Sequence, residues 1–175
     1  DWSSDVCSSD LVHMVTIIPR GMAGGFTAYL PEEDRYYMTK KQMENELVQL
    51  LGGRVAEALV LEDISTGAQN DIERATKVAR RMVTHYGMSG KLGPMTYGTD
   101  EEEVFVGRDF GRSRNYSEEV AAAIDSEMRG LIDIAYNKAE ELLKENINVL
   151  HKVAEALLER ETLDGKEFEE IFVGA

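Results

Sequence analysis

The chain has 175 residues, of which 43% are hydrophobic and 30% are charged, and its formal net charge is −14. This length suits one domain with a sizeable core. The excess of acids argues against nucleic-acid binding, which requires a basic surface. No apolar run reaches the roughly 18 residues of a membrane-spanning helix, so we expect no span of that kind in this chain.

Residues 1–11 have a different character from the rest of the chain. They are rich in Ser and Asp, lack any period, and contain its single Trp and single Cys, Trp2 and Cys7. The segment resembles a translated sequencing adapter, so we exclude it from the fold as an artefact; a natural disordered tail is the alternative. Residues 12–175 contain no cysteine, which excludes disulfides and cysteine-based zinc sites there. We expect one truncated domain over 12–175.

Two short strands are predicted near the start. Val12 to Pro19 is an apolar, β-branched run typical of a buried strand. Phe26 to Pro31 predicts a second, short strand, and Pro31 indicates that this strand ends at or near a sheet edge. An edge strand can accept an extended peptide, although an ordinary edge that ends in a charged turn is the commoner interpretation.

A long helix is predicted from Thr39, which forms a capping box with Gln42. Gly52 and Gly53 lie in its interior, where each costs about 1 kcal/mol relative to alanine. The pair therefore predicts close approach of another backbone, or a distortion of the helix. Glu57 stands between two alanines and is either buried with a partner or, as is commoner for Glu, solvated.

The segment Ser65 to Thr76 places an acid where a glycine-bearing loop turns into a helix. Asn70 is a suitable N-cap with Glu73 three residues later, and Asp71 complements the helix dipole in the first turn. An apolar stripe then predicts a helix to Tyr86, with Gly87 as the C-cap. Asp71 has two interpretations: a first-turn acid with no further role, which is the commoner case, or one ligand of a metal.

The remainder is predicted to be helical after a loop. Residues 87–116 contain Gly93-Pro94 and a short strand-like run, Val104 to Val106. Ser117 caps a helix to about Glu145, a second helix covers Ile147 to Leu158, and Asp164 with Glu167 caps a short third one. The predicted fold is mainly α, with a small β element near the N-terminus.

The residues of this chain do not make a complete active site by themselves. There is no phosphate-binding Gly-x-x-x-x-Gly-Lys-Ser/Thr and no Gly-x-Ser-x-Gly turn around a nucleophile. His13, His85 and His151 are its three histidines, and no two of them form a His-x-x-x-His pair. A catalytic zinc site needs three converging protein ligands, so each lone histidine is better interpreted as structural.

Six blocks of sequence occur in a fixed order along the chain. They are Val15-Thr16-Ile17-Ile18-Pro19-Arg20-Gly21, Tyr29-Leu30-Pro31-Glu32-Glu33-Asp34, Leu51-Gly52-Gly53-Arg54-Val55-Ala56-Glu57, Ser65 to Thr76, Met88-Ser89-Gly90-Lys91-Leu92-Gly93-Pro94 and Val104-Phe105-Val106-Gly107-Arg108. Together they resemble, over residues 12–172, the peptidase domain of the FtsH family of membrane-anchored, ATP-dependent zinc metalloproteases. Unlike a short isolated motif, several ordered blocks argue against a chance likeness to an unrelated acidic helical adaptor.

The resemblance implies a Zn²⁺ held by two histidines of a His-Glu-x-x-His helix and by a later Asp, which matches Asp71. Two imidazoles and one carboxylate leave an open zinc position for water, and the Glu of that motif would be the general base. This chain contains no His-Glu-x-x-His. We therefore expect the general base to be absent and the chain alone to be inactive.

The resemblance also implies the surroundings of the domain. These are an AAA ATPase module in cis, to which ATP and Mg²⁺ would bind outside this chain, a homo-hexamer, and unfolded membrane and soluble proteins as substrates. The parent would be anchored in a bacterial or organellar inner membrane, with this domain on the cytoplasmic or equivalent side.

Two further site assignments are expectations. The strand Phe26, Thr27, Ala28, Tyr29 and Leu30 is the candidate to bind substrate backbone, and Glu57 is the candidate to support a metal ligand through hydrogen bonds. The alternative function is a non-catalytic helical assembly module derived from the same family.

Overall fold

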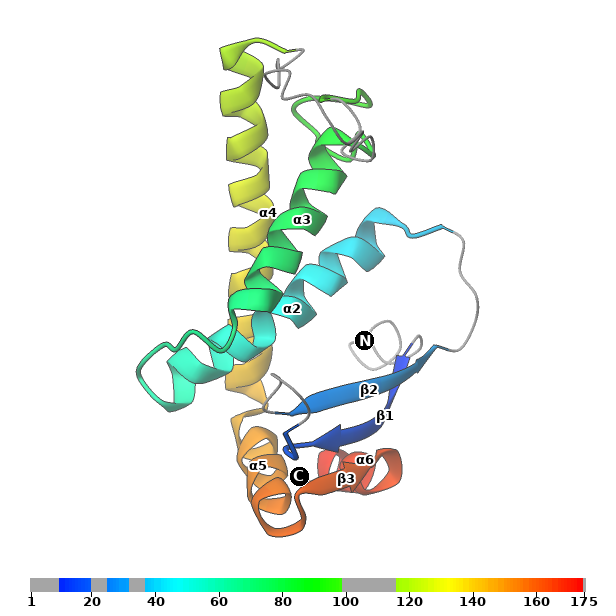
Figure 1. The fold of residues 1–175 in the computed structure, drawn as a ribbon, viewed down its shortest axis with the longest axis vertical. Coiled ribbons are helices and arrows are strands. Elements are labelled where there is room, and N and C mark those ends of the chain that lie inside the picture. Colours follow the sequence, from blue (N-terminus) through cyan, green and yellow to red (C-terminus); the bar gives the residue numbers. More distant parts are fainter. Residues whose placement is uncertain (1–9, 20–24, 32–36, 99–115, 175) are drawn as a thin grey trace, which may run out of the picture. The chain divides into compact units, whose positions relative to one another are not determined.

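A computed structural model of the chain describes residues 10–19, 25–31, 37–98 and 116–174 (Figure 1). Within these ranges the chain forms five helices and three strands, which confirms a mainly α fold with a small β element. The chain divides into two compact units. The first unit comprises residues 1–37 and 142–175, and the second unit comprises residues 38–141. No helix in the described ranges is long and apolar enough to cross a membrane.

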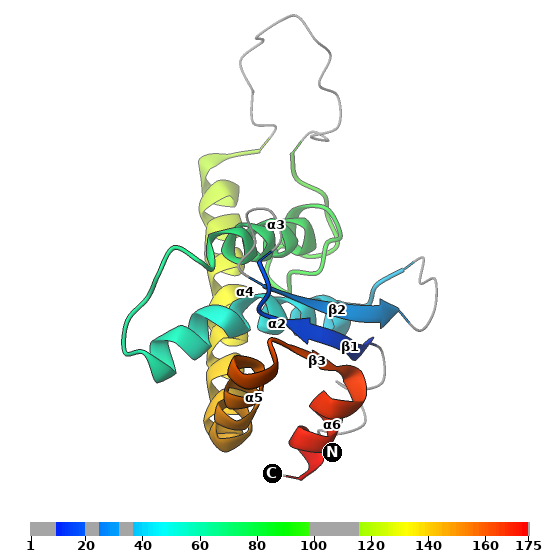
Figure 2. The same cartoon turned by 60° about the horizontal axis from the view of Figure 1, so that its bottom comes forward.

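The first unit contains an antiparallel sheet in the order β2-β1-β3 (Figures 1 and 2). Its strands are β1 (Asp10–Thr16), β2 (Phe26–Pro31) and β3 (Thr162–Asp164). The register of β1 against β2 shifts between Val12 and Met14. Among the described strands β2 has one neighbour, so it is an edge strand, as its terminal proline predicted.

Two helices complete the first unit, α5 (Ile147–Arg160) and α6 (Gly165–Val173). Between α5 and β3 the backbone turns at Glu161, which has a left-handed φ of 62°. Buried Thr16 fastens β1 to this corner, because its Oγ1 donates to the Glu161 carbonyl at 3.1 Å and lies 2.8 Å from Thr162 Oγ1. Leu163 of β3, the residue after Thr162, is fully buried.

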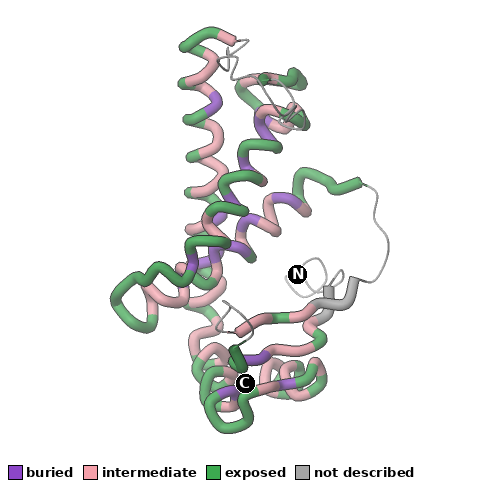
Figure 3. Tube along the Cα trace, in the orientation of Figure 1, coloured by how far each residue is buried: buried purple, intermediate pink, exposed green. Residues whose placement is uncertain are grey.

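The second unit is built from α2 (Lys40–Val60), α3 (Gln69–Thr84) and most of α4 (Glu118–Glu145). Apolar side chains at helical spacing form one core, because each helix turns one stripe toward the others. Figure 3 shows the buried positions recurring along α2 and α3. The buried members of the core are Met43, Leu47, Leu50, Leu51, Ala75, Ala79, Met82 and Ala135.

Most predicted helix boundaries are confirmed. Thr39 and Gln42 form a capping box at α2, Asp164 and Glu167 form another at α6, and Ser117 Oγ accepts from Val120 N at the start of α4. These signals are confined to four consecutive residues, so they act whatever the rest of the chain does.

Two expectations about the backbone are wrong, and one element was not expected. The strand predicted from Val12 to Pro19 ends at Thr16 and is only partly buried, because the chain turns toward the α5–β3 corner there. Gly52 and Gly53 neither break α2 nor admit a close neighbour, since a Cβ on either would meet no described atom within 4 Å. The short strand β3 was not anticipated.

The remaining expectations have different outcomes. Asp10 and Leu11 form backbone pairs with Pro31 and Leu30, so strand β1 begins two residues before Val12, where the domain was expected to start; the domain assignment itself stays a prediction. The adapter origin of residues 1–11 stays a prediction. The strand-like run Val104 to Val106 lies outside the described residues.

Candidate functional site

The candidate site centres on the loop between α2 and α3, residues 61–68. This loop ends at Ala68, which is the N-cap residue of α3 and provides no side-chain cap. The predicted N-cap, Asn70, is therefore wrong, because the helix begins one residue before it. Backbone bonds close the turn instead: Gln69 N donates to the Thr66 carbonyl at 3.1 Å, and Ile72 N donates to the Ala68 carbonyl at 3.0 Å.

Asp71 lies in the first turn of α3, as predicted. Its side chain is 47% exposed, and Oδ1 lies 3.8 Å from Arg74 Nη1 one turn along the helix. An exposed pair of this kind contributes little to stability. The carboxylate thus stands at the positive end of the helix dipole with one loose partner, which is an arrangement that leaves it available to a cation.

Glu57, near the end of α2, holds the loop that leads to Asp71. One carboxylate oxygen accepts from Ser65 Oγ at 2.5 Å, and the other accepts from Ser65 N at 3.4 Å. Ser65 Oγ in turn accepts from Gly67 N at 3.1 Å. Glu57 therefore contacts the loop and not Asp71 itself. Ser65 was not among the predicted site residues, because a contact between a helix and a loop leaves no periodic pattern in the sequence.

The same contacts set the charge of Glu57. The hydroxyl of Ser65 lowers the pKa of Glu57 most, and Ser65 N and the Arg54 guanidinium lower it further. Desolvation and the nearby Asp63 act in the opposite direction without reversing the shift. Arg54 Nη1 lies 3.5 Å from Glu57 Oε2. The carboxylate is therefore held ionised against the loop.

The described residues do not by themselves fit a zinc ion. A catalytic zinc needs three protein ligands, and no group of three or more His, Cys, Asp or Glu in the described part of the chain could hold a metal. Asp71 offers one carboxylate at an accessible helix start. Among the described residues the geometry therefore supports one zinc ligand, Asp71.

The candidate substrate strand lies in the first unit and coincides with β2. Thr27 is exposed, while Phe26 and Ala28 are partly buried. The side chains of Tyr29 and Leu30 lie outside the described residues, although their backbones pair with Val12 and Leu11. The strand therefore has the edge position that peptide addition requires.

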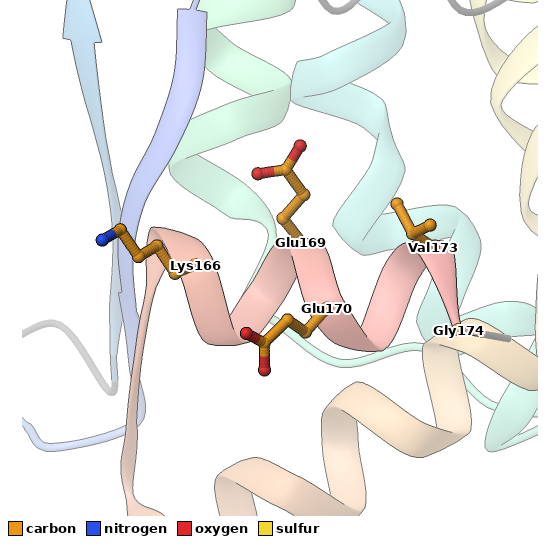
Figure 4. A pocket seen from close by; sticks show the side chains of 5 residues that line it. All are labelled: Lys166, Glu169, Glu170, Val173 and Gly174. Carbon is orange, nitrogen blue, oxygen red and sulfur yellow. The ribbon is translucent and has the colours of Figure 1, made fainter.

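An open hollow lies along α6 and contains none of the predicted site residues. Its lining residues are Lys166, Glu169, Glu170, Val173 and Gly174. Figure 4 shows the side chains of Glu169 and Glu170 pointing to different sides of the helix. Because these carboxylates diverge, the hollow does not offer convergent ligands.

Known proteins match nearly the whole chain. The sequence model of peptidase family M41 matches residues 5–171. The chain belongs to this family. The M41 match confirms the resemblance noted in the sequence, and it includes Asp71, Glu57 and β2 in one continuous region.

Relatives of this M41 chain carry the name of a complete protease. The chain is 69% identical over 163 residues to "ATP-dependent zinc metalloprotease FtsH 1" of Thermoanaerobacter sp. (strain X514). The match covers 93% of this chain and 27% of that relative. The chain is 66% identical to "ATP-dependent zinc metalloprotease FtsH" of Caldicellulosiruptor bescii, covering 93% of this chain and 26% of that protein. The chain thus spans about a quarter of these relatives' length.

Proposed function

We propose that this M41 chain is the C-terminal part of the peptidase domain of an ATP-dependent zinc metalloendopeptidase, and that Asp71 is one of its zinc ligands. The observation that carries the proposal is the family match over residues 5–171, in which Asp71 occupies an accessible first turn. The names of the two relatives indicate the class of reaction, which is hydrolysis of peptide bonds.

A chimera tests this assignment directly. Residues 12–171 of this chain replace the matching segment of the Thermoanaerobacter protein, and zinc content and casein cleavage are measured. We expect the chimera to bind zinc and cleave casein, and Asp71→Asn to abolish both, because the amide is a far weaker zinc ligand than a carboxylate.

Glu119→Gln is the matched control, since Glu119 is an exposed first-turn acid of α4. We expect it to leave both readouts unchanged. Full zinc content and cleavage in Asp71→Asn would overturn the ligand assignment.

The chain alone is a separate case. It contains no His-Glu-x-x-His, and its described residues form no metal cluster. We expect purified residues 1–175 neither to hold zinc tightly nor to cleave casein. One tightly bound zinc per chain together with casein cleavage would contradict this expectation.

The substrate class follows from the edge strand. β2 has one sheet neighbour among the described strands, and Thr27 is exposed on it. We infer that an unfolded polypeptide adds to this edge as an extra strand, since main-chain hydrogen bonds recognise extended chains of any sequence.

A photoreactive benzophenone side chain at position 27 tests the contact between β2 and the polypeptide. We expect crosslinks to unfolded casein, and none from the same group at exposed Glu169 on α6; equal yields would overturn it.

The remaining features are proposals that rest on the family resemblance. We propose that the parent protein has an AAA ATPase module in cis, which binds ATP and Mg²⁺, and that it assembles as a homo-hexamer. We also propose a membrane anchor in a bacterial or organellar inner membrane, with this domain on the cytoplasmic or equivalent side. The alternative is a non-catalytic assembly module of the same family. The DNA before the codon of Val12 distinguishes the two, because a His-Glu-x-x-His there supports the protease and its absence from an intact gene supports the assembly module.

A further inference from the structure

Arg54 is a cation with an unusual environment for a helix of the second unit. Its side chain is 17% exposed, and its Nη1 atom is buried without a hydrogen-bond partner. Burial of a guanidinium is unfavourable unless an anion compensates. The compensating anion is Glu57, whose Oε2 lies 3.5 Å from that Nη1 and whose side chain is 23% exposed.

The Arg54–Glu57 pair differs from a second ion pair of α2 that the structure describes. Lys40 and Glu44 also lie one turn apart, at 3.8 Å, but their side chains are 51% and 44% exposed. Water screens such a pair, which fixes little geometry. Both side chains of the Arg54–Glu57 pair are less than a quarter exposed, so water screens this pair less and the guanidinium restricts where the Glu57 carboxylate can lie.

The position of that carboxylate decides the path of the loop. Glu57 accepts two hydrogen bonds from Ser65, and Ser65 Oγ accepts from Gly67 N. A Cβ placed on Gly67 would lie 3.2 Å from Ser65 Oγ and 3.8 Å from Glu57 Oε1. Carboxylate, hydroxyl and loop backbone are therefore packed together directly before α3 begins.

We propose that Arg54 is a positioning residue for the loop that presents Asp71, and that it acts by fixing the Glu57 carboxylate against Ser65. The inference rests on the proposed function of Asp71 as a zinc ligand. The end of α2, the loop and the start of α3 all belong to the second unit.

The first test uses the chain itself and two substitutions of Arg54. Arg54→Met keeps an apolar stem without the charge, and Arg54→Lys keeps the charge without the planar group. By NMR, we expect Arg54→Met to raise the pKa of Glu57, since Arg54 lowers it while Asp63, the other charge nearby, raises it. We also expect the Gly67 amide to exchange about tenfold faster. Arg54→Lys should fall between Arg54→Met and the wild type.

Lys40→Met is the matched control, because it removes the exposed cation of α2. It should change neither the Glu57 pKa nor the Gly67 exchange rate. If Arg54→Met is folded and leaves both unchanged, the proposal is wrong. If Arg54→Met does not fold, the same two readouts in Arg54→Lys decide the outcome.

The second test measures zinc affinity in the chimera with the Thermoanaerobacter protein. A group hydrogen-bonded to a metal ligand is typically worth about 10–100-fold in affinity. Arg54 acts on Asp71 only through Glu57 and the loop, so we expect Arg54→Met to lose at most about tenfold. Combined with Glu57→Gln, the further loss should be less than about twofold, because both substitutions break the same chain of contacts.

The variant Asp71→Asn distinguishes failure of the proposed zinc-ligand role of Asp71 from failure of the positioning role of Arg54. If Asp71→Asn leaves zinc affinity unchanged, the proposed function fails. If Asp71→Asn removes zinc binding but Arg54→Met does not weaken it, the role of Arg54 alone is refuted. Fully additive effects of Arg54→Met and Glu57→Gln would also refute it.

Discussion

The helices α6 and α3 begin in opposite ways. At α6, Asp164 Oδ1 accepts from Lys166 N and Glu167 N at 2.9 Å each, and Glu167 Oε2 accepts from Asp164 N at 3.0 Å. At α3, Ala68 has no side chain that can cap, and the preceding loop is held by Glu57, eight residues before Ser65. At the start of α6 the carboxylates bond to the helix's own amides. At the start of α3 the loop is held by Glu57 of α2, and Asp71 stays accessible.

The largest expected effect comes from the close packing at the start of α6. A Cβ on Gly165 would lie against the carbonyl oxygen of Val12 in β1. We expect Gly165→Ala to destabilise the chain by about 2–3 kcal/mol, as overpacking does, measured by urea unfolding. Gly130→Ala in α4 is the control: its Cβ would meet no described atom within 4 Å, so a gain of up to about 1 kcal/mol is expected. Equal changes in the two variants would contradict the packing argument.

The caps themselves give the next effect. We expect Asp164→Ala to cost about 1 kcal/mol, because two amides at the start of α6 lose their acceptor. Asn70→Ala should change the unfolding free energy by less than about 0.5 kcal/mol, since Asn70 lies inside α3 and is not its cap. A larger loss in Asn70→Ala than in Asp164→Ala would reverse the comparison.

A local effect is expected from the loop before α3. Ser65→Ala removes the donor to Glu57 and the acceptor of Gly67 N. Each net hydrogen bond contributes about 1 kcal/mol, so hydrogen exchange at Gly67 should rise while amides of the α3 core stay protected. Uniform loss of protection along α3 would show that the loop is not a separate opening unit.

The smallest effect concerns pH. The pKa of Glu57 is lower in the folded chain than in the unfolded chain, mainly because of the Ser65 hydroxyl. The stabilisation that Glu57 contributes is therefore fully present above its unfolded pKa and is lost as the pH falls through the lower folded pKa. Glu57→Gln should flatten the unfolding free energy in this acidic window, and a profile parallel to that of the wild type would contradict this.

The sequence predicts structure where the cause is local. The capping boxes at Thr39 and Asp164 span four residues each, and the stripe from Met43 to Val55 follows from one helical period, so each is visible without tertiary information. β2 has the predicted bounds because proline ends it. By contrast, β3 is three residues long and is a strand because it pairs with β1. No local pattern specifies such a partner.

The candidate site shows the same division. The place of Asp71 in a first turn was predictable from the acids that follow the glycine loop, whereas its role depends on ligands that local sequence does not indicate. Arg54 and Glu57 lie near the end of α2, and Glu57 contacts the loop through Ser65. Since helix and loop share no period, the contact could be found only in three dimensions.

The sheet of the first unit also imposes an order on synthesis. Thr16 and Thr162 are 146 residues apart and share a hydrogen bond, so the central strand gains its second neighbour only after that many further residues have been synthesised. The second unit is continuous in sequence, and its helices can pack during that interval. Until then β1 exposes an unpaired side, a hazard for aggregation in a growing polypeptide.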